Sequence, residues 1–232
     1  MSQANVLVLP GLLEDADGFE GVIATANDRA TFVVADLTRA DSIAALADEA
    51  LKQAPAGPIH LAGHSMGGYV ALEIMRRAPG RVTKLALLNT HARPDSAEST
   101  ENRRRLMALA ESDFDAVAST LLPKLMTPEH LRDPVLTGII GAMALAVGKD
   151  AFLRQETAII GRIDSRPRLK EIRCPTLVVA ARHDALMPLE LLQELSDGIS
   201  GSRLAIVEDS GHMSILEQPE TVAQLLRDWI GE

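Results

Sequence analysis

Six short runs of apolar residues, rich in valine, leucine and alanine, are spread along the chain. Within most of these runs the apolar positions are continuous and do not alternate with polar ones. Such runs are typical of strands in a parallel sheet whose two faces are both covered by helices. We therefore predict strands over residues 6–9, 31–35, 59–62, 85–88, 176–181 and 203–207.

Segments with helical spacing separate several of the predicted strands. Asp41 or Ser42 is placed to cap the first of them, and Pro188 precedes another. The predicted helices cover residues 43–53, 65–78, 189–196 and 221–230. This alternation predicts an α/β fold, with a doubly wound and mostly parallel sheet joined by right-handed crossovers.

The alternation stops over residues 93–166, where no convincing strand is found. Helical spacing continues there over residues 103–111, 114–122, 134–146 and 151–163, with proline and glycine between the helices. We predict a helical cap, inserted into a core formed by residues 1–92 and 167–232. Ligands of such sheets bind at the carboxyl ends of the strands, so an insertion at that edge covers the binding crevice. Most apolar cap residues are expected to be core, and a minority to line a pocket.

Composition narrows the class of protein. The chain of 232 residues is 47% hydrophobic and 24% charged, which is ordinary for a globular enzyme of one domain. Its net charge of −9 argues against nucleic acid or an anionic membrane as a partner. The single Cys174 excludes an internal disulfide framework and argues against a cysteine-based zinc site. Neither a secretion signal nor an apolar run of membrane-spanning length is present, so a cytoplasmic location is the default expectation.

The segment Gly63-His64-Ser65-Met66-Gly67 stands where a predicted strand gives way to a predicted helix. A serine between two glycines at such a turn is how a fold exposes a strained nucleophile. The glycines are expected because side chains in so tight a turn would collide with the neighbouring strand and helix. Ser65 is therefore the candidate nucleophile.

A serine hydroxyl needs a base within hydrogen-bond reach, and that base needs a third group to orient it. Among the six histidines, His212 follows the last predicted strand, at the same edge of the sheet as Ser65. His91 is a distant second choice and is better explained as a pocket-lining or core residue. Asp184 follows the strongest strand of the second half and is the candidate acid, with Asp209 as the alternative.

An oxyanion hole requires two backbone N–H groups that point at the developing negative oxygen. One is expected from Met66, the residue after the nucleophile. The other is expected from the Pro10-Gly11-Leu12 loop after the first strand, with Leu12 as the preferred donor. A Pro-Gly pair alone indicates only a turn. Because the pair stands directly after a predicted strand, we expect this loop to supply the second N–H group of the oxyanion hole.

With these residues assembled, the chain resembles the α/β-hydrolase fold superfamily over essentially its whole length. The order Ser65, Asp184, His212 is the order of that fold. Within it, the chain is most similar to small bacterial esterases that include pimeloyl-carrier-protein methyl esterases, perhydrolases and enol-lactone hydrolases. The joint pattern is specific for the superfamily and poorly specific within it.

Three features depart from the pattern that the resemblance implies. Pro10 stands where members usually carry histidine before the glycine, which alters loop packing more than chemistry. The segment 36–42 lacks two glycines that members tend to have, so this loop is expected to take another path. The chain also begins at a strand that resembles the family's third, so the usual antiparallel edge strands are expected to be absent.

We expect a serine hydrolase that cleaves esters of small or medium acyl groups through an acyl-enzyme, without a metal or an organic cofactor. A lactone hydrolase, a carbon–carbon bond hydrolase or a perhydrolase would use the same triad. A binding protein of this fold with weak turnover is a further alternative, which the intact triad disfavours. Arg103-Arg104-Arg105 suggests docking of an acidic carrier protein, but solvated arginines on several helix faces explain the run more simply.

Overall fold

The computed structural model describes residues 3–232, and its centre is a sheet of six parallel strands in the order β2-β1-β3-β4-β5-β6. Every predicted strand is present, with some ends shifted by one to three residues. The strands are β1 Ala4–Leu9, β2 Ala30–Val34, β3 Ile59–His64, β4 Val82–Leu88, β5 Thr176–Ala181 and β6 Arg203–Val207. The predicted fold class is confirmed, and within the described residues all neighbouring strands pair in parallel.

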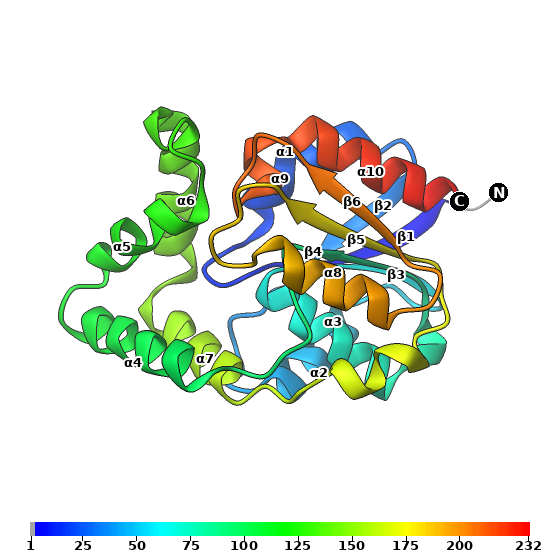
Figure 1. The fold of residues 1–232 in the computed structure, drawn as a ribbon, viewed down its shortest axis with the longest axis horizontal. Helices are drawn as coiled ribbons and strands as arrows, with labels where there is room; N and C mark the ends of the chain where they lie inside the picture. Colours follow the sequence, from blue (N-terminus) through cyan, green and yellow to red (C-terminus); the bar gives the residue numbers. More distant parts are fainter. Residues whose placement is uncertain (1–2) are drawn as a thin grey trace.

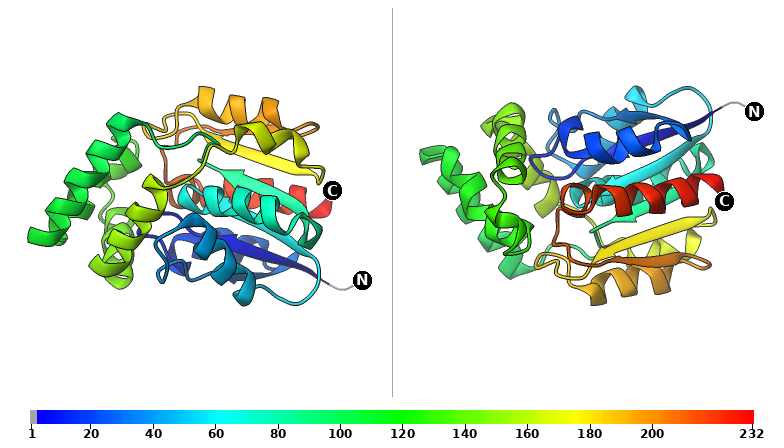
Figure 2. Two further views of the ribbon diagram at one scale, coloured as in Figure 1. Left: turned by 90° about the horizontal axis from the view of Figure 1, so that it is seen from below. Right: turned by 90° about the horizontal axis from the view of Figure 1, so that it is seen from above.

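Helices cover both faces of the sheet, as the continuous apolar runs require. Figures 1 and 2 show α2, α3 and α8 on one face and α1 and α10 on the other. Leu46, Ile74 and Leu192 pack into the first face, and Val22 and Trp229 into the second. The helices of this core are α1 Glu20–Ala26, α2 Ile43–Gln53, α3 Met66–Arg77, α8 Leu189–Gly198, α9 Ser214–Glu217 and α10 Pro219–Gly231.

The order of the strands creates a switch point between β1 and β3. The chain first moves from β1 to β2 at one edge, then crosses to β3 on the other side of β1. At such a point, the connections that follow two adjacent strands run in opposite directions. A crevice that can bind a ligand forms between them, at the carboxyl ends of the strands. Leu9 and Gly63 are register partners at the ends of β1 and β3, so the loop after β1 lies beside the turn that holds Ser65.

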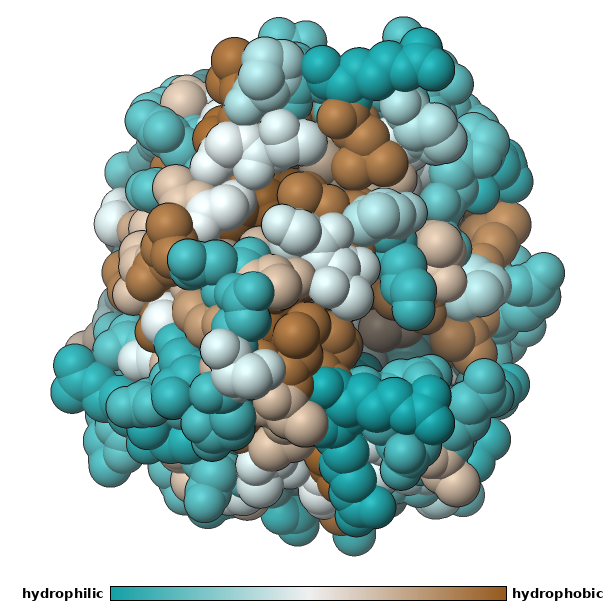
Figure 3. Space-filling view, turned by 90° about the vertical axis from the view of Figure 1, so that its left-hand side faces the viewer, coloured by the Kyte–Doolittle hydropathy of each residue, from teal (hydrophilic) through white to brown (hydrophobic). Residues whose placement is uncertain are grey.

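Four helices between β4 and β5 lie beyond the carboxyl ends of the strands (Figure 1). They are α4 Ala97–Ser112, α5 Asp115–Leu125, α6 Pro134–Val147 and α7 Lys149–Ile160. A small core of their own includes Val117, Ala144 and Phe152, together with Leu13 from the loop after β1. Figure 3 faces this side of the molecule and shows hydrophobic areas between hydrophilic ones. Val135 and Leu145 of α6 are exposed large hydrophobic residues.

Short helices mark the main differences from the sequence prediction. A 3-10 turn at Ala16–Phe19 and the helix α1 follow β1, where no helix was expected. Only Val22 and Ala26 of α1 are buried, too few to give a visible periodicity. Further 3-10 turns occur at Pro79–Arg81, His130–Arg132 and Arg166–Glu171. The helix α5 continues through Pro123 to Leu125, although the proline was expected to end it.

Within residues 3–232, no single helix is both long and apolar enough to cross a membrane. The pair α6 and α7 passes the length and composition test only when taken together, and it is bent by 91° at the break.

Candidate active site

Ser65 occupies the turn between β3 and α3 in a strained backbone conformation, with φ of 51° and ψ of −115°. Its N–H donates to the carbonyl of Leu88 at 3.0 Å, and its carbonyl accepts from the hydroxyl of Thr90 at 2.8 Å. A Cβ at Gly67 would overlap the Leu9 carbonyl, and one at Gly63 would overlap the Gly67 carbonyl. The strain is held in place by the adjacent strands and by the absence of these two side chains.

His212 lies in the loop between β6 and α9, and both of its ring nitrogens are engaged. Its Nε2 is 2.8 Å from the Oγ of Ser65, and its Nδ1 is 2.8 Å from Oδ2 of Asp184. The carboxylate of Asp184 only accepts, so Nδ1 carries the proton and Nε2 accepts from the serine hydroxyl. The three predicted side chains thus form one chain of hydrogen bonds. His91 and Asp209 make no hydrogen bond to Ser65 or His212 within the described part of the chain.

Asp184 follows β5 and is buried. Its Oδ2 also accepts from Nδ2 of Asn89 at 2.9 Å, and its Oδ1 accepts from the backbone N–H groups of Leu186 and Met187, each at 2.9 Å. Burial on its own would raise the pKa of Asp184, but the neighbouring His212 and the hydrogen bonds outweigh it and hold this pKa below its ordinary value. The carboxylate is therefore charged and locked in one orientation.

Asn89 is a site residue that the sequence analysis missed. It follows the last residue of β4, has a positive φ of 47°, and is fully buried. Its Nδ2 donates to Asp184 and its Oδ1 accepts from Ser214 at 2.6 Å, so its amide connects β5 to the helix after His212. Its place directly after a strand marks it as lying at the edge of the sheet where Ser65 lies, but its contact with Asp184, 95 residues away, is visible only in the structure.

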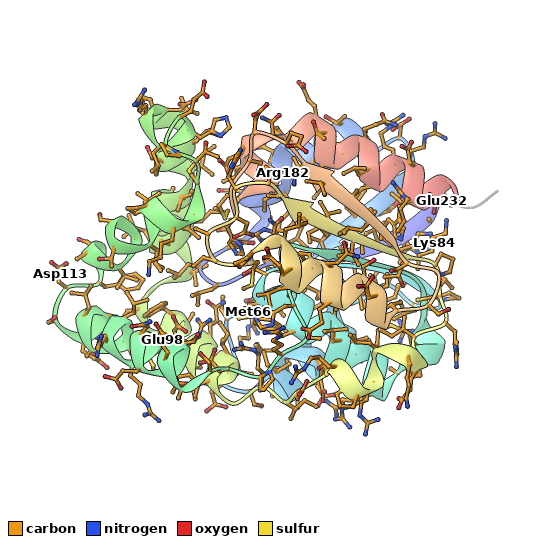
Figure 4. The ribbon with its side chains drawn as sticks, in the orientation of Figure 1. Met66, Lys84, Glu98, Asp113, Arg182 and Glu232 are labelled. Atoms are coloured by element: carbon orange, nitrogen blue, oxygen red, sulfur yellow. The ribbon has the colours of Figure 1, made fainter. Side chains whose placement is uncertain are left out.

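Two backbone N–H groups near Ser65 have no hydrogen-bond partner within residues 3–232. One belongs to Met66, at the first turn of α3, where Figure 4 places it at the end of the sheet that faces α4 to α7. The other belongs to Leu12. Its neighbours are occupied, since Gly11 N–H donates to Oε2 of Glu14 at 2.7 Å and Leu13 N–H to Oε1 of Gln155 at 3.1 Å. Both predicted oxyanion donors are thus available to a ligand.

A buried pair, Glu14 and His64, connects three loops of the site. Glu14 belongs to the loop after β1, His64 precedes Ser65, and His64 in turn contacts the loop that holds His212. Nδ1 of His64 is 2.9 Å from both carboxylate oxygens of Glu14, and Nε2 donates to the carbonyl of His212 at 3.0 Å. His64 points away from the Ser65 hydroxyl, as expected for a residue inside the turn. Burial on its own would lower the pKa of His64, but the Glu14 carboxylate and the His212 carbonyl raise it above its ordinary value. The sequence analysis missed Glu14, which no motif marks.

The raised pKa of His64 predicts that the protein becomes less stable as the pH rises. Above the ordinary histidine pKa of about 6.5 the unfolded chain has lost a proton that the folded protein still holds, so the free energy of unfolding falls as pH rises through this window. Urea denaturation at several pH values between about 6 and 9 measures the slope of the free energy of unfolding against pH. The variant Glu14→Gln should flatten it, because the neutral amide no longer favours the imidazolium.

Glu129→Gln, at an exposed position between α5 and α6, is the matched control and should keep the slope of the unchanged protein. Equal slopes for Glu14→Gln and the unchanged protein would contradict a charged His64.

A pocket opens above Ser65, between the loops of the core and the helices α4 to α7. Ser65, Met66 and His212 lie at its base, and Leu12 is at its side. Its lining includes both apolar side chains and a group of charged ones. His91, the second candidate base, also lines this pocket, in agreement with the interpretation given to it above.

Comparison with known proteins agrees with this geometry. The alpha/beta hydrolase family matches residues 7–225. A pimeloyl-[acyl-carrier protein] methyl ester esterase of Neisseria meningitidis serogroup B is 30% identical over 201 residues, which cover 84% of this chain and 78% of the relative. A thermophilic esterase from Thermogutta terrifontis is 30% identical, with a TM-score of 0.91, and the match covers 99% of this chain and 90% of that one. An enol-lactonase from Burkholderia xenovorans shares the fold at 22% identity, with a TM-score of 0.90 over 100% of this chain and 93% of that one. The chain therefore belongs to the alpha/beta hydrolase family, and it is a hydrolase.

Proposed function

We propose that the protein hydrolyses carboxylic esters of small or medium acyl groups through an acyl-enzyme on Ser65. The observation that carries this proposal is the unbroken chain of 2.8 Å hydrogen bonds from Ser65 Oγ through His212 to Asp184. His212 Nε2 takes the serine proton as Oγ attacks the ester carbonyl, and then gives that proton to the leaving alcohol. Asp184 holds the ring in this tautomer and stabilises the imidazolium.

The negative oxygen of the tetrahedral intermediate is stabilised by the N–H groups of Leu12 and Met66. Support comes from the lack of any other partner for these two groups in the described residues. Each such donor contributes on the order of 3 kcal/mol to the stability of the transition state. Water then attacks the acyl carbon while His212 takes its proton, and His212 gives that proton to Oγ of Ser65 as the bond from Oγ to the acyl group breaks and the carboxylic acid leaves.

We assign the role of a cap over this site to residues 93–166. Support comes from the position of α4 to α7 at the carboxyl ends of the strands and from their side chains in the wall of the pocket. The cytoplasmic location expected from the sequence stays a prediction.

Docking of a carrier protein through Arg103, Arg104 and Arg105 receives no support from the geometry. Arg103 turns inward and pairs with Glu156 at 2.8 Å, and Arg105 pairs with Glu101 at 3.3 Å on the surface. Only two of the three guanidinium groups therefore face solvent. The substrate of the Neisseria relative is named as carrier-linked, so a carrier protein as partner remains a prediction that needs another surface.

A fluorophosphonate probe tests the proposed function directly. The probe phosphonylates a serine only where a base activates it, so we expect mass spectrometry of the digested protein to find the label on Ser65. Hydrolysis of a para-nitrophenyl ester should be lost in proportion to labelling. A protein that stays unlabelled and cleaves no ester, lactone or thioester would overturn the proposal in favour of a binding protein.

A further inference from the structure

The pocket above Ser65 has two chemically different ends. One wall, from α4, α5 and α6, is apolar and includes Leu106, Leu121, Leu125, Ile140 and Met143. A second group of lining residues is polar and joined by hydrogen bonds, ion pairs and a cation–π contact, and it forms the other end considered below: Tyr69, His91, Asp95, Arg103, Glu156 and Arg162. The proposed catalytic steps use none of these six residues. A polar cluster of this size is costly to bury, so its hydrogen bonds decide what it can bind.

Tyr69 directs an unused hydroxyl proton to this end of the pocket. The backbone N–H of Arg93 donates to Nδ1 of His91 at 3.0 Å, so Nδ1 carries no proton. Burial, followed by the charge of nearby arginines, lowers the pKa of His91 to about 4, so the ring is neutral at neutral pH and its proton lies on Nε2. That Nε2 therefore donates to Oη of Tyr69 at 3.2 Å. The Tyr69 hydroxyl is left as a donor, and no acceptor for it occurs within residues 3–232.

The two arginines also keep unused donors. Arg162 donates through Nε to the Arg93 carbonyl, and through Nη1 to Asp95 at 2.7 Å and to the Ile159 carbonyl at 2.8 Å. Arg103 uses Nε for Asp95 and Nη1 for Glu156. In the described residues, Nη2 of neither arginine has a hydrogen-bond partner. The Arg162 guanidinium lies 4.5 Å from the centre of the Tyr69 ring, which places this cation beside the unused hydroxyl.

Most hydrogen-bond acceptors at this end of the pocket are already occupied. Both oxygens of Asp95 accept hydrogen bonds, from the two arginines and from Thr100. Glu156 accepts from Arg103 through Oε2, while its Oε1 is buried and has no hydrogen-bond partner within residues 3–232. Lys124, at the rim of the pocket, adds a cation that forms no ion pair within the described residues. Within the described residues, the unused donors of Tyr69, Arg103, Arg162 and Lys124 thus outnumber the unused acceptor, Oε1 of Glu156.

We propose that the Tyr69, Arg103 and Arg162 end of the pocket binds a carboxylate carried by the ester substrate. A carboxylate offers several lone pairs and no donor, which complements three unused donors on two cations and a phenol. The inference rests on the proposed function for the reaction at Ser65 and adds the class of substrate, an ester with a second, anionic end. The apolar wall then receives the other part of the molecule.

The test compares esters with and without the carboxylate. The first set is the para-nitrophenyl half-esters of dicarboxylic acids from succinate to suberate, each paired with an ester in which an isopropyl group replaces the carboxylate. A second set, acetate esters of hydroxy acids and of the matching branched alcohols, places the charge on the alcohol side. We expect at least one carboxylate ester, in one of the two sets, to have a kcat/KM at least about tenfold higher than that of its neutral partner. The difference should lie mainly in KM.

Two variants assign that preference to the proposed residues. Arg103→Gln should remove most of it, whereas Arg104→Gln, the matched change on the exposed neighbour, should leave it intact. Tyr69→Phe keeps the ring and removes only the hydroxyl, with its hydrogen bond from His91, so it should reduce the preference about tenfold even if Arg103→Gln fails to fold. Calorimetric binding of the same pairs to Ser65→Ala protein gives a reading that does not depend on turnover, and the same preference is expected there.

The outcomes separate the two proposals. Cleavage of neutral esters with no preference for a carboxylate in either set, in turnover or binding, overturns the subsite and leaves the proposed function intact. An equal loss of preference in Arg104→Gln and Arg103→Gln also overturns it, because a surface charge effect would then explain the result. Preferential carboxylate binding without ester cleavage or probe labelling retains the subsite and overturns the proposed function.

Discussion

Replacing Ser65 by alanine is expected to lower kcat/KM for an activated ester by roughly a million-fold while the protein stays folded, because a triad loses nearly all of its advantage with its nucleophile. The residual rate would come from the proposed oxyanion donors Leu12 and Met66 and from binding, neither of which the change touches. Alanine also keeps the Cβ, and with it the same backbone strain at φ of 51°. The loss should therefore appear in activity and not in stability.

The measurement is steady-state hydrolysis of a para-nitrophenyl ester, with circular dichroism and a thermal melt of each protein beside it. Ser119→Ala, on the exposed side of α5, is the matched control and should retain full activity. A Ser65→Ala protein that keeps a tenth or more of the rate would refute the assigned nucleophile. Hydrolysis would then have to proceed through a water activated by His212.

Much of the fold was predictable because a covered parallel sheet leaves a strong local signal. Most residues of the central strands β1, β3, β4 and β5 are buried, so these strands are largely apolar, and the β5 prediction at 176–181 matches the observed element Thr176–Ala181. The helices α2 and α3 have one apolar face and clear starts. The helix α1 left no such signal, because it buries only two side chains.

The residues named for catalysis were predictable for a topological reason. In a parallel sheet, every loop that follows a strand lies at the same edge, so Ser65, Asp184 and His212 had to be neighbours. Asn89 and Glu14 were not found, because their roles depend on partners far along the chain. Glu14 contacts a histidine 50 residues away, and Asn89 contacts an aspartate 95 residues away. No local pattern carries that information.

The charged end of the pocket could not be predicted for a related reason. Arg103, Arg104 and Arg105 are adjacent in the sequence, yet one helix turns each of them to a different direction. The packing of α4 against α7 determines which of the three side chains points inward. This side chain is Arg103, which forms an ion pair with Glu156 of α7. Whether the Tyr69 hydroxyl donates to the pocket likewise depends on the tautomer of His91, which the backbone N–H of Arg93 selects.

Replacing Asp184 by asparagine is expected to lower kcat by about ten-thousand-fold, although the change preserves the shape of the side chain. Oδ1 of Asp184 accepts two backbone N–H groups, so the asparagine oxygen must take that position. Its NH2 group then occupies the place of Oδ2, where it faces Nδ1 of His212 and the Nδ2 donor of Asn89. His212 can accept this N–H only by moving its proton to Nε2, and in that tautomer it cannot take the proton of Ser65.

The matched control is Asp209→Asn, the same change at the other aspartate that the sequence offered as the acid. Asp209 is exposed and makes no hydrogen bond to His212 within residues 3–232, so its variant should keep activity within about twofold of the unchanged protein. Single-turnover kinetics with an activated ester measure the acylation step for both variants, and probe labelling of Ser65 should slow in Asp184→Asn alone. Equal rates for the two variants would show that the orientation of His212 does not depend on Asp184, and the acid would then have to be sought among the other groups that contact its ring.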